Sequence, residues 1–146
     1  MKTHILCLGD SNTHGYCADP NDCADHGIRF NEEERWTCRL QKALGDEYLV
    51  TEEGLSGRTT VFVDPIHESM DALSVIYALL KSHEVIDLLI IMLGTNDVKE
   101  RFNANAACIG AGSGTADPQG QERGLLGDQG SQHPRRGPAP HRRWLP

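Results

Sequence analysis

Three short apolar runs, each followed by a glycine and polar residues, constrain the fold of this chain more than any other feature. They occupy residues 4–8, 48–51 and 88–93. The last of them, Leu88-Leu89-Ile90-Ile91-Met92-Leu93, contains six apolar residues without a break. Uncharged runs of this length are typical of the strands of parallel sheets, which are covered on both faces. We therefore predict three strands.

Helical patterns separate these strands. Asn31 is expected to cap a first helix, with three glutamates in its first turn and a stop at Gly45. A second amphipathic helix is expected over residues 69–82. Strands that alternate with helices predict an α/β protein with a parallel sheet and helices packed on its faces. The loops that follow the three strands should then meet at one edge of the sheet.

Charge and cysteine content exclude several classes of protein. The formal net charge of −7 argues against a nucleic-acid partner. The five cysteines are odd in number and form no Cys-x-x-Cys pair, so they are not a disulfide framework and they suit a reducing compartment. No apolar stretch has the length of a signal segment or a membrane span. We expect a cytoplasmic protein without a membrane partner.

The composition changes near Cys108. Residues 1–107 carry a net charge of −9, whereas residues 108–146 carry +2, with 8 glycines and 5 prolines. A segment this poor in large apolar residues is not expected to form a core of its own. The run Gly110-Ala111-Gly112-Ser113-Gly114 looks like a nucleotide loop, but it follows no predicted strand. We predict one domain over residues 1–109 and an irregular tail over residues 110–146.

Ser11 is the candidate nucleophile. It follows the first strand directly, at the position where open α/β sheets bind their ligands. Backbone N–H groups in such a turn can point at an anion. The alternative is that Asp10, Ser11 and Asn12 only cap a helix or close a turn. This stretch alone leaves both interpretations open.

With all three strand-end loops considered, the chain resembles the SGNH (GDSL) hydrolase family. Gly9-Asp10-Ser11 is similar to the first sequence block of that family, Gly57 within residues 54–60 to the second, and Gly94-Thr95-Asn96-Asp97 to the third. The likeness covers about residues 2–109 and is closest to the arylesterase and acyltransferase branch. Arg35-Trp36-Thr37 and residues 52–56 and 90–97 are similar to stretches of that branch.

The resemblance implies a fold and a mechanism. The fold is a three-layer, flavodoxin-like parallel sheet with helices on both faces, here truncated after the third strand. Ser11 is implied as the nucleophile of an ester hydrolase. The N–H groups of Ser11 and Gly57 and the amide of Asn96 are implied as the oxyanion hole, which needs donors of this kind. Asp10 is expected to anchor its loop, and His14 to be a loop residue. The resemblance implies no cofactor and no metal.

One element of the family is absent from the sequence. The resemblance implies an Asp-x-x-His motif that supplies the general base, but residues 108–146 contain none; the tail histidines are His133 and His141. The last strands and the final helix of the family fold are also missing. A shift of reading frame that begins near residues 111–113 would explain both this loss and the change in composition.

Two hypotheses about function follow. The first is a serine ester hydrolase or acyltransferase that acts on a small-molecule ester, with this chain as its amino-terminal half. The second is a non-catalytic fragment or binding module that keeps the oxyanion pocket. An Asp-x-x-His motif in another reading frame of the encoding DNA beyond Cys108 would favour the first. Because the third strand would lack its neighbour in the sheet, we also expect self-association.

Overall fold

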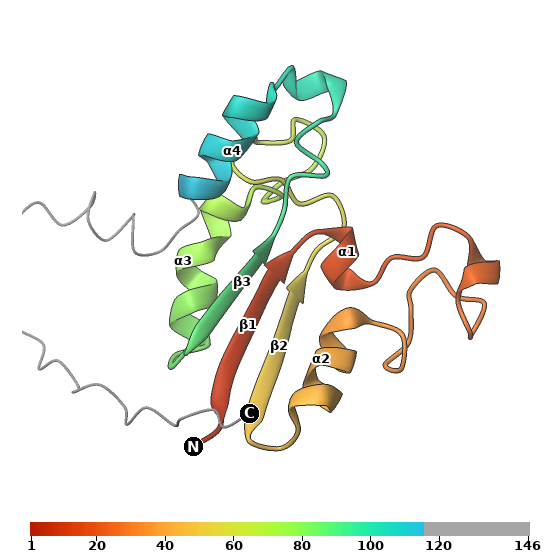
Figure 1. Cartoon of the computed structure of the whole chain (residues 1–146). Coiled ribbons are helices and arrows are strands. Elements are labelled where there is room, and N and C mark those ends of the chain that lie inside the picture. Colours follow the sequence, from red (N-terminus) through yellow and green to blue (C-terminus); the bar gives the residue numbers. More distant parts are fainter. Residues whose placement is uncertain (116–146) are drawn as a thin grey trace, which may run out of the picture.

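The chain folds into an open sheet of three parallel strands with helices packed on it (Figure 1). This computed structural model describes residues 1–115. The strands are β1 (Thr3–Gly9), β2 (Tyr48–Gly54) and β3 (Leu88–Met92), and the helices are α1 (Ser11–His14), α2 (Trp36–Leu44), α3 (Ala72–Ser82) and α4 (Ala106–Thr115). Two 3-10 helices, η1 (Pro20–Asp22) and η2 (Glu100–Phe102), lie in the loops. The predicted α/β class and parallel sheet are confirmed.

Strand β1 is the centre of the sheet, in the order β2-β1-β3. It pairs with β2 from Thr3 to Gly9 and with β3 from Ile5 to Gly9. Every residue of β1 after Thr3 is buried. The uncharged run that predicted this strand is therefore explained by its position between two partners and two helical layers.

Helices cover both faces of the sheet. Successive side chains of a strand point to opposite sides, so each face presents its own set of side chains to a different helix. On one face, Leu8 of β1 packs against Ala72 and Ile76 of α3 in the apolar core. On the other face, Val50 and Glu52 of β2 line a pocket together with residues of α2. Figure 1 shows α2 beside β2 and α3 beside β3. Among the described residues, no helix is long and apolar enough to cross a membrane.

Several predicted boundaries differ from the structure, and the helix expected over residues 69–82 begins at Ala72. Side-chain pairing explains two further differences. Asn31 caps only one turn, since its Oδ1 accepts from the Glu33 N–H at 3.0 Å. Helix α2 begins at Trp36, after Arg35, whose ψ of 132° is not helical. The second strand was expected to end at Thr51, but β2 continues to Gly54. The carboxylate of Glu52 pairs with two arginines, and the carboxylate of Glu53 pairs with His83. Because both carboxylates have partners, they can lie within a strand.

The expected start of the irregular tail is also wrong, because residues 110–115 belong to α4. The Asn105 side chain accepts from the Cys108 N–H at 2.9 Å and so caps this helix. A Cβ added at Gly112 would lie 2.5 Å from Thr60 Oγ1 and 3.1 Å from Val61 Cγ2, so a residue without a side chain lets the helix pack closely on the loop of residues 60–61. The rest of the predicted tail, residues 116–146, lies outside the described residues.

Gly54→Ala is expected to destabilise the fold. Its Cβ would lie 2.2 Å from the backbone nitrogen of His14 and 2.6 Å from its Cα, and backbone atoms cannot rotate away. We expect a loss of at least about 2 kcal/mol in the free energy of unfolding, measured by urea denaturation. The control is Gly27→Ala, whose Cβ would meet nothing nearer than 3.7 Å and should change stability by no more than about 0.5 kcal/mol. Equal losses in the two variants would contradict this interpretation.

The open edge of β3 generates a second prediction. Within residues 1–115, β3 pairs with β1 alone, and its residues Leu88 and Met92 are 50% and 42% exposed. We propose that this edge makes the chain self-associate. Leu88→Lys should lower the mass measured by light scattering at micromolar concentration, because a lysine on an edge strand disfavours pairing.

The matched control for Leu88→Lys is Val63→Lys, at a 74% exposed loop position away from the sheet. This control should leave the measured mass unchanged. A wild-type chain that is already monomeric under these conditions would rule out association through β3.

Candidate active site

Ser11 is the first residue of α1, directly after β1. The helix is capped by Asp10, which is fully buried and accepts from the Asn12 backbone N–H at 2.9 Å. Asp10 also accepts from the Asn12 side-chain amide at 2.9 Å. Asp10 therefore anchors this loop, as expected. Because it supplies the cap, the partly exposed Ser11 hydroxyl is not needed for capping, and no hydrogen bond engages it among the described residues.

Gly57 lies in a turn that the Arg58 N–H closes by donating to Leu55 O at 3.0 Å. Its φ of +95° is a backbone conformation that favours glycine. A Cβ at this position would also lie 2.8 Å from the Met70 side chain. The Gly57 N–H donates to no atom of residues 1–115, so it is a free donor in this part of the chain.

Asn96 is 8% exposed and follows β3 in the loop that begins with Gly94. Its Nδ2 donates to the backbone oxygen of Arg58 at 3.0 Å. An amide nitrogen carries two donors, and the second has no partner in the described part of the chain. The next residue, Asp97, is fully buried and accepts from the backbone N–H of Thr60 at 2.9 Å.

Hydrogen bonds link the three strand-end loops to one another. The Asn12 amide donates to Thr95 Oγ1 at 3.4 Å, which joins the first loop to the third. The bond from Asn96 to Arg58 O joins the third loop to the second. Arg58 Nη1 donates to Gly9 O at 3.1 Å, which joins the second loop to the first. The loops that carry Ser11, Gly57 and Asn96 thus meet at the carboxyl edge of the sheet.

No histidine of the described residues is hydrogen-bonded to Ser11. His4 contacts Val85 O and Thr51 Oγ1, and His83 contacts Glu53 at 2.8 Å. The ring of His67 lies 3.7 Å from an oxygen of Asp64. These three rings are therefore engaged away from the nucleophile.

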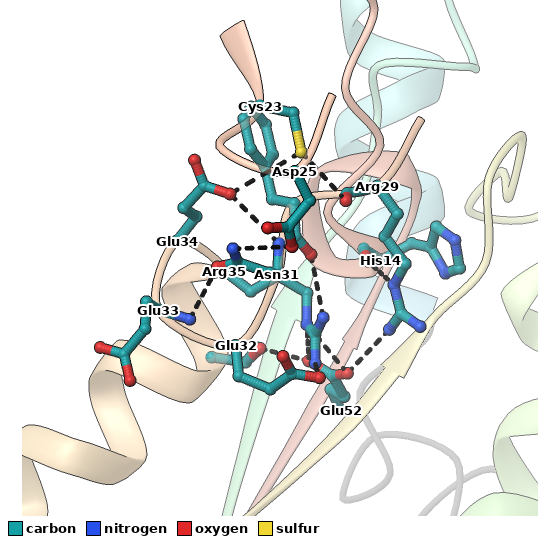
Figure 2. Close-up of polar contacts among 12 residues, drawn as sticks. His14, Cys23, Asp25, Arg29, Asn31, Glu32, Glu33, Glu34, Arg35 and Glu52 are labelled. Carbon is teal, nitrogen blue, oxygen red and sulfur yellow. Dashed lines mark hydrogen bonds and ion pairs between the residues drawn. The ribbon is translucent and has the colours of Figure 1, made fainter. Parts of the chain in front are cut away.

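Glu52 is a hub that the sequence analysis did not identify. It lies on β2 with its carboxylate 2.9 Å from Arg29 Nη2 and 3.3 Å from Arg35 Nε (Figure 2). It also accepts from the Thr37 hydroxyl. Arg29 Nε donates in turn to His14 O at 2.8 Å, at the end of α1. Glu52 thus holds the long loop of residues 17–35 beside the Ser11 helix. The signal available in the sequence was the presence of two arginines, Arg29 and Arg35, in this acidic loop.

A pocket of about 300 Å³ lies under α2 and not at the strand ends. Its lining comes from α2 and β2: Thr37, Cys38, Gln41, Val50 and Glu52. Beside Glu52 in the sheet register is Cys7, whose pKa is raised to about 11, first by burial and then by the Glu52 charge. A thiol with a raised pKa is a poor nucleophile at neutral pH, so Cys7 is a core residue and not a competitor of Ser11.

Comparisons with known proteins agree on one family. The model of the GDSL-like Lipase/Acylhydrolase family matches residues 7–133. The structure of Est24, a carbohydrate acetylesterase from Sinorhizobium meliloti, is similar with a TM-score of 0.73 and 38% identity, over 81% of this chain and 54% of that one. The native aryl esterase of M. smegmatis gives a TM-score of 0.69 and 39% identity, over 77% of this chain and 52% of that one.

A putative arylesterase from Agrobacterium tumefaciens str. C58 is also similar, with a TM-score of 0.63 and 38% identity, over 77% of this chain and 51% of that one. A search of curated proteins finds no match. The chain spans about half the length of the solved structures that it matches.

The Glu52 hub generates a prediction about the loop of residues 17–35. Glu52→Gln should loosen this loop, because charge-assisted hydrogen bonds contribute about 1.5 kcal/mol or more each. We expect cleavage near Ile28 and Phe30 by thermolysin to become about tenfold faster, in proportion to the population of the open loop. Cleavage at the wild-type rate would show that Glu52 does not hold the loop.

The matched control is Glu33→Gln. Glu33 pairs with Lys42 at 2.7 Å, but both side chains are about three-quarters exposed. Exposed ion pairs contribute little to stability, so this variant should be cleaved at the wild-type rate.

Proposed function

This chain belongs to the GDSL-like lipase/acylhydrolase family, and we propose on that premise that it acts on carboxylic esters through an acyl-enzyme on Ser11. Ser11 Oγ attacks the acyl carbon and loses its proton to a general base. The alcohol leaves, and water or a second alcohol then takes the acyl group from Ser11. Transfer of the acyl group to a second alcohol, in place of water, corresponds to the acyltransferase activity that the resemblance implied.

The observation that carries this proposal is the set of hydrogen bonds that link the three loops. In the described part of the chain the Ser11 hydroxyl has no partner and is free to attack, and three donors are also without partners: the N–H of Ser11, the N–H of Gly57 and one N–H of the Asn96 amide. The oxyanion that forms on the acyl carbon needs such uncharged, fixed donors. We assign the oxyanion hole to the N–H groups of Ser11 and Gly57 and to Asn96 Nδ2.

No hydrogen bond among residues 1–115 connects Ser11 to a general base. The rings of His4, His67 and His83 are engaged elsewhere, so His14 and His26 are the only other histidines of residues 1–115. This observation favours a second candidate, a chain that binds esters in the oxyanion pocket without turning them over. Its signature is hydrolysis no faster than that of the Ser11→Ala variant.

The first test is hydrolysis of p-nitrophenyl acetate by the chain as it stands. We expect weak activity that Ser11→Ala abolishes. In other serine hydrolases, loss of the base histidine lowers kcat by about 10⁶, while the oxyanion hole and substrate binding retain a rate enhancement of roughly 10³–10⁴ over the reaction in water. Ser82→Ala, at an exposed serine on α3, is the matched control and should leave the rate unchanged. An ordinary enzyme rate that depends on Ser11 would instead reveal a base within this chain, and His14→Ala would identify it.

The second arm adds the implied base. A fusion that supplies a carboxyl-terminal family segment with its Asp-x-x-His motif should raise the rate by several orders of magnitude. Ser11→Ala should abolish this gain. In the fusion, Asn96→Ala should lower kcat by about 10²–10³, as loss of one oxyanion donor does in other serine hydrolases.

A further inference from the structure

We propose that Arg58 is a positioning residue that holds the Ser11, Gly57 and Asn96 loops in their mutual geometry. This inference rests on the function proposed above. Arg58 lies in the second loop, is 6% exposed, and was given no role from the sequence.

The side chain of Arg58 ties the ends of two strands together. Its Nη1 donates to Gly9 O at 3.1 Å and also to Glu53 O. Gly9 is the last residue of β1 and stands two positions before Ser11. Glu53 is the second-last residue of β2. One nitrogen atom therefore bridges the end of the strand that leads into the nucleophile and the end of the strand that leads into the Gly57 turn, where the Leu55 N–H also donates to Gly9 O at 3.1 Å.

The backbone of Arg58 makes hydrogen bonds that fix the other two donors, the Gly57 N–H and the Asn96 amide. Its N–H closes the turn that contains Gly57 by donating to Leu55 O at 3.0 Å. Its carbonyl accepts from Asn96 Nδ2 at 3.0 Å, which orients the second amide N–H. Each proposed oxyanion donor is thus connected to Arg58 through a short path of hydrogen bonds and chain.

The electrostatics of Arg58 fit positioning better than stabilisation. Burial lowers the pKa of its guanidinium. The negative charges of Glu53 and Asp10 act in the opposite direction but do not cancel this effect. Arg58 Nε and Asp10 Oδ2 are buried without a partner in the described part of the chain. Unpaired buried polar atoms cost stability, and well-packed apolar residues often replace buried charges without loss. Stability alone would not select this arrangement.

A small displacement of these loops matters for catalysis. Oxyanion donors act on a position that the substrate oxygen reaches only in the transition state, so their placement affects kcat more than KM. A misplacement of about 1 Å can cost about 10²-fold in rate.

The test compares Arg58→Met and Arg58→Lys with Arg39→Met, at an exposed arginine on α2. The first readout is the Ser11-dependent hydrolysis of p-nitrophenyl acetate, with kcat and KM measured separately and Ser11→Ala as the blank. The second needs no activity. It is the side-chain amide pair of Asn96 in the ¹H–¹⁵N spectrum, assigned by its loss in Asn96→Asp, with the pair of Asn21 as a reference.

We expect Arg58→Met to lower kcat by about 10- to 100-fold while KM stays within about threefold. Arg58→Lys keeps a buried cation and its N–H donors, so it should fall between Arg58→Met and the wild type. The Asn96 pair should shift in both variants, while the Asn21 pair does not. Arg39→Met should match the wild type in both readouts.

A folded Arg58→Met variant with wild-type kcat, or with an unmoved Asn96 pair, would overturn the inference. If Arg58→Met does not fold, the same two readouts on Arg58→Lys decide in the same way. A wild-type chain no more active than Ser11→Ala would refute the proposed function instead. The Asn96 resonances would then still test whether Arg58 positions the Asn96 amide.

Discussion

The hydrogen-bond ladders on both sides of β1 are the constraint on which the rest of the structure depends. They set β2 and β3 parallel to β1, and the strands and helices around β1 bury it from His4 to Gly9. Three parallel strands end at one edge of the sheet, and so the loops after them have to meet there. The candidate active site is a direct consequence of this geometry, because each of its loops follows one strand.

Close packing at the strand ends refines that geometry. A Cβ at Gly9 would lie 2.0 Å from Thr13 Oγ1, and one at Gly54 would meet the backbone of His14. Glycine at both positions lets α1 lie directly on the ends of β1 and β2. This approach places Asn12 of the Ser11 helix within hydrogen-bonding reach of Thr95 in the third loop, so packing and chemistry depend on the same two residues.

Charged residues organise the surroundings of the site. Glu52 on one face of β2 collects Arg29 and Arg35 from the long loop, while Glu53 on the other face pairs with His83. These carboxylates interrupt what would otherwise be an apolar strand, and their partners compensate for their partial burial. Both β2 and β3 are edge strands in the described part of the chain, but β3 carries no such charges, which leaves it the element most open to association.

The sequence by itself determined the α/β class, the three strands, and the meeting of the Ser11, Gly57 and Asn96 loops, because hydrophobic runs and the parallel connection rule act locally. Only the tertiary structure decided where α2 begins and how far β2 extends, since Arg35 and Glu52 pair across 17 positions of the chain. It also decided that residues 110–115 form a helix, because Gly112 packs on Thr60. The contacts of Arg58 belong to the same class. The sequence shows that position 58 is an arginine but not what it contacts. Its partners Gly9, Glu53 and Asn96 are far apart from one another in the sequence, and only the folded chain brings them together around it.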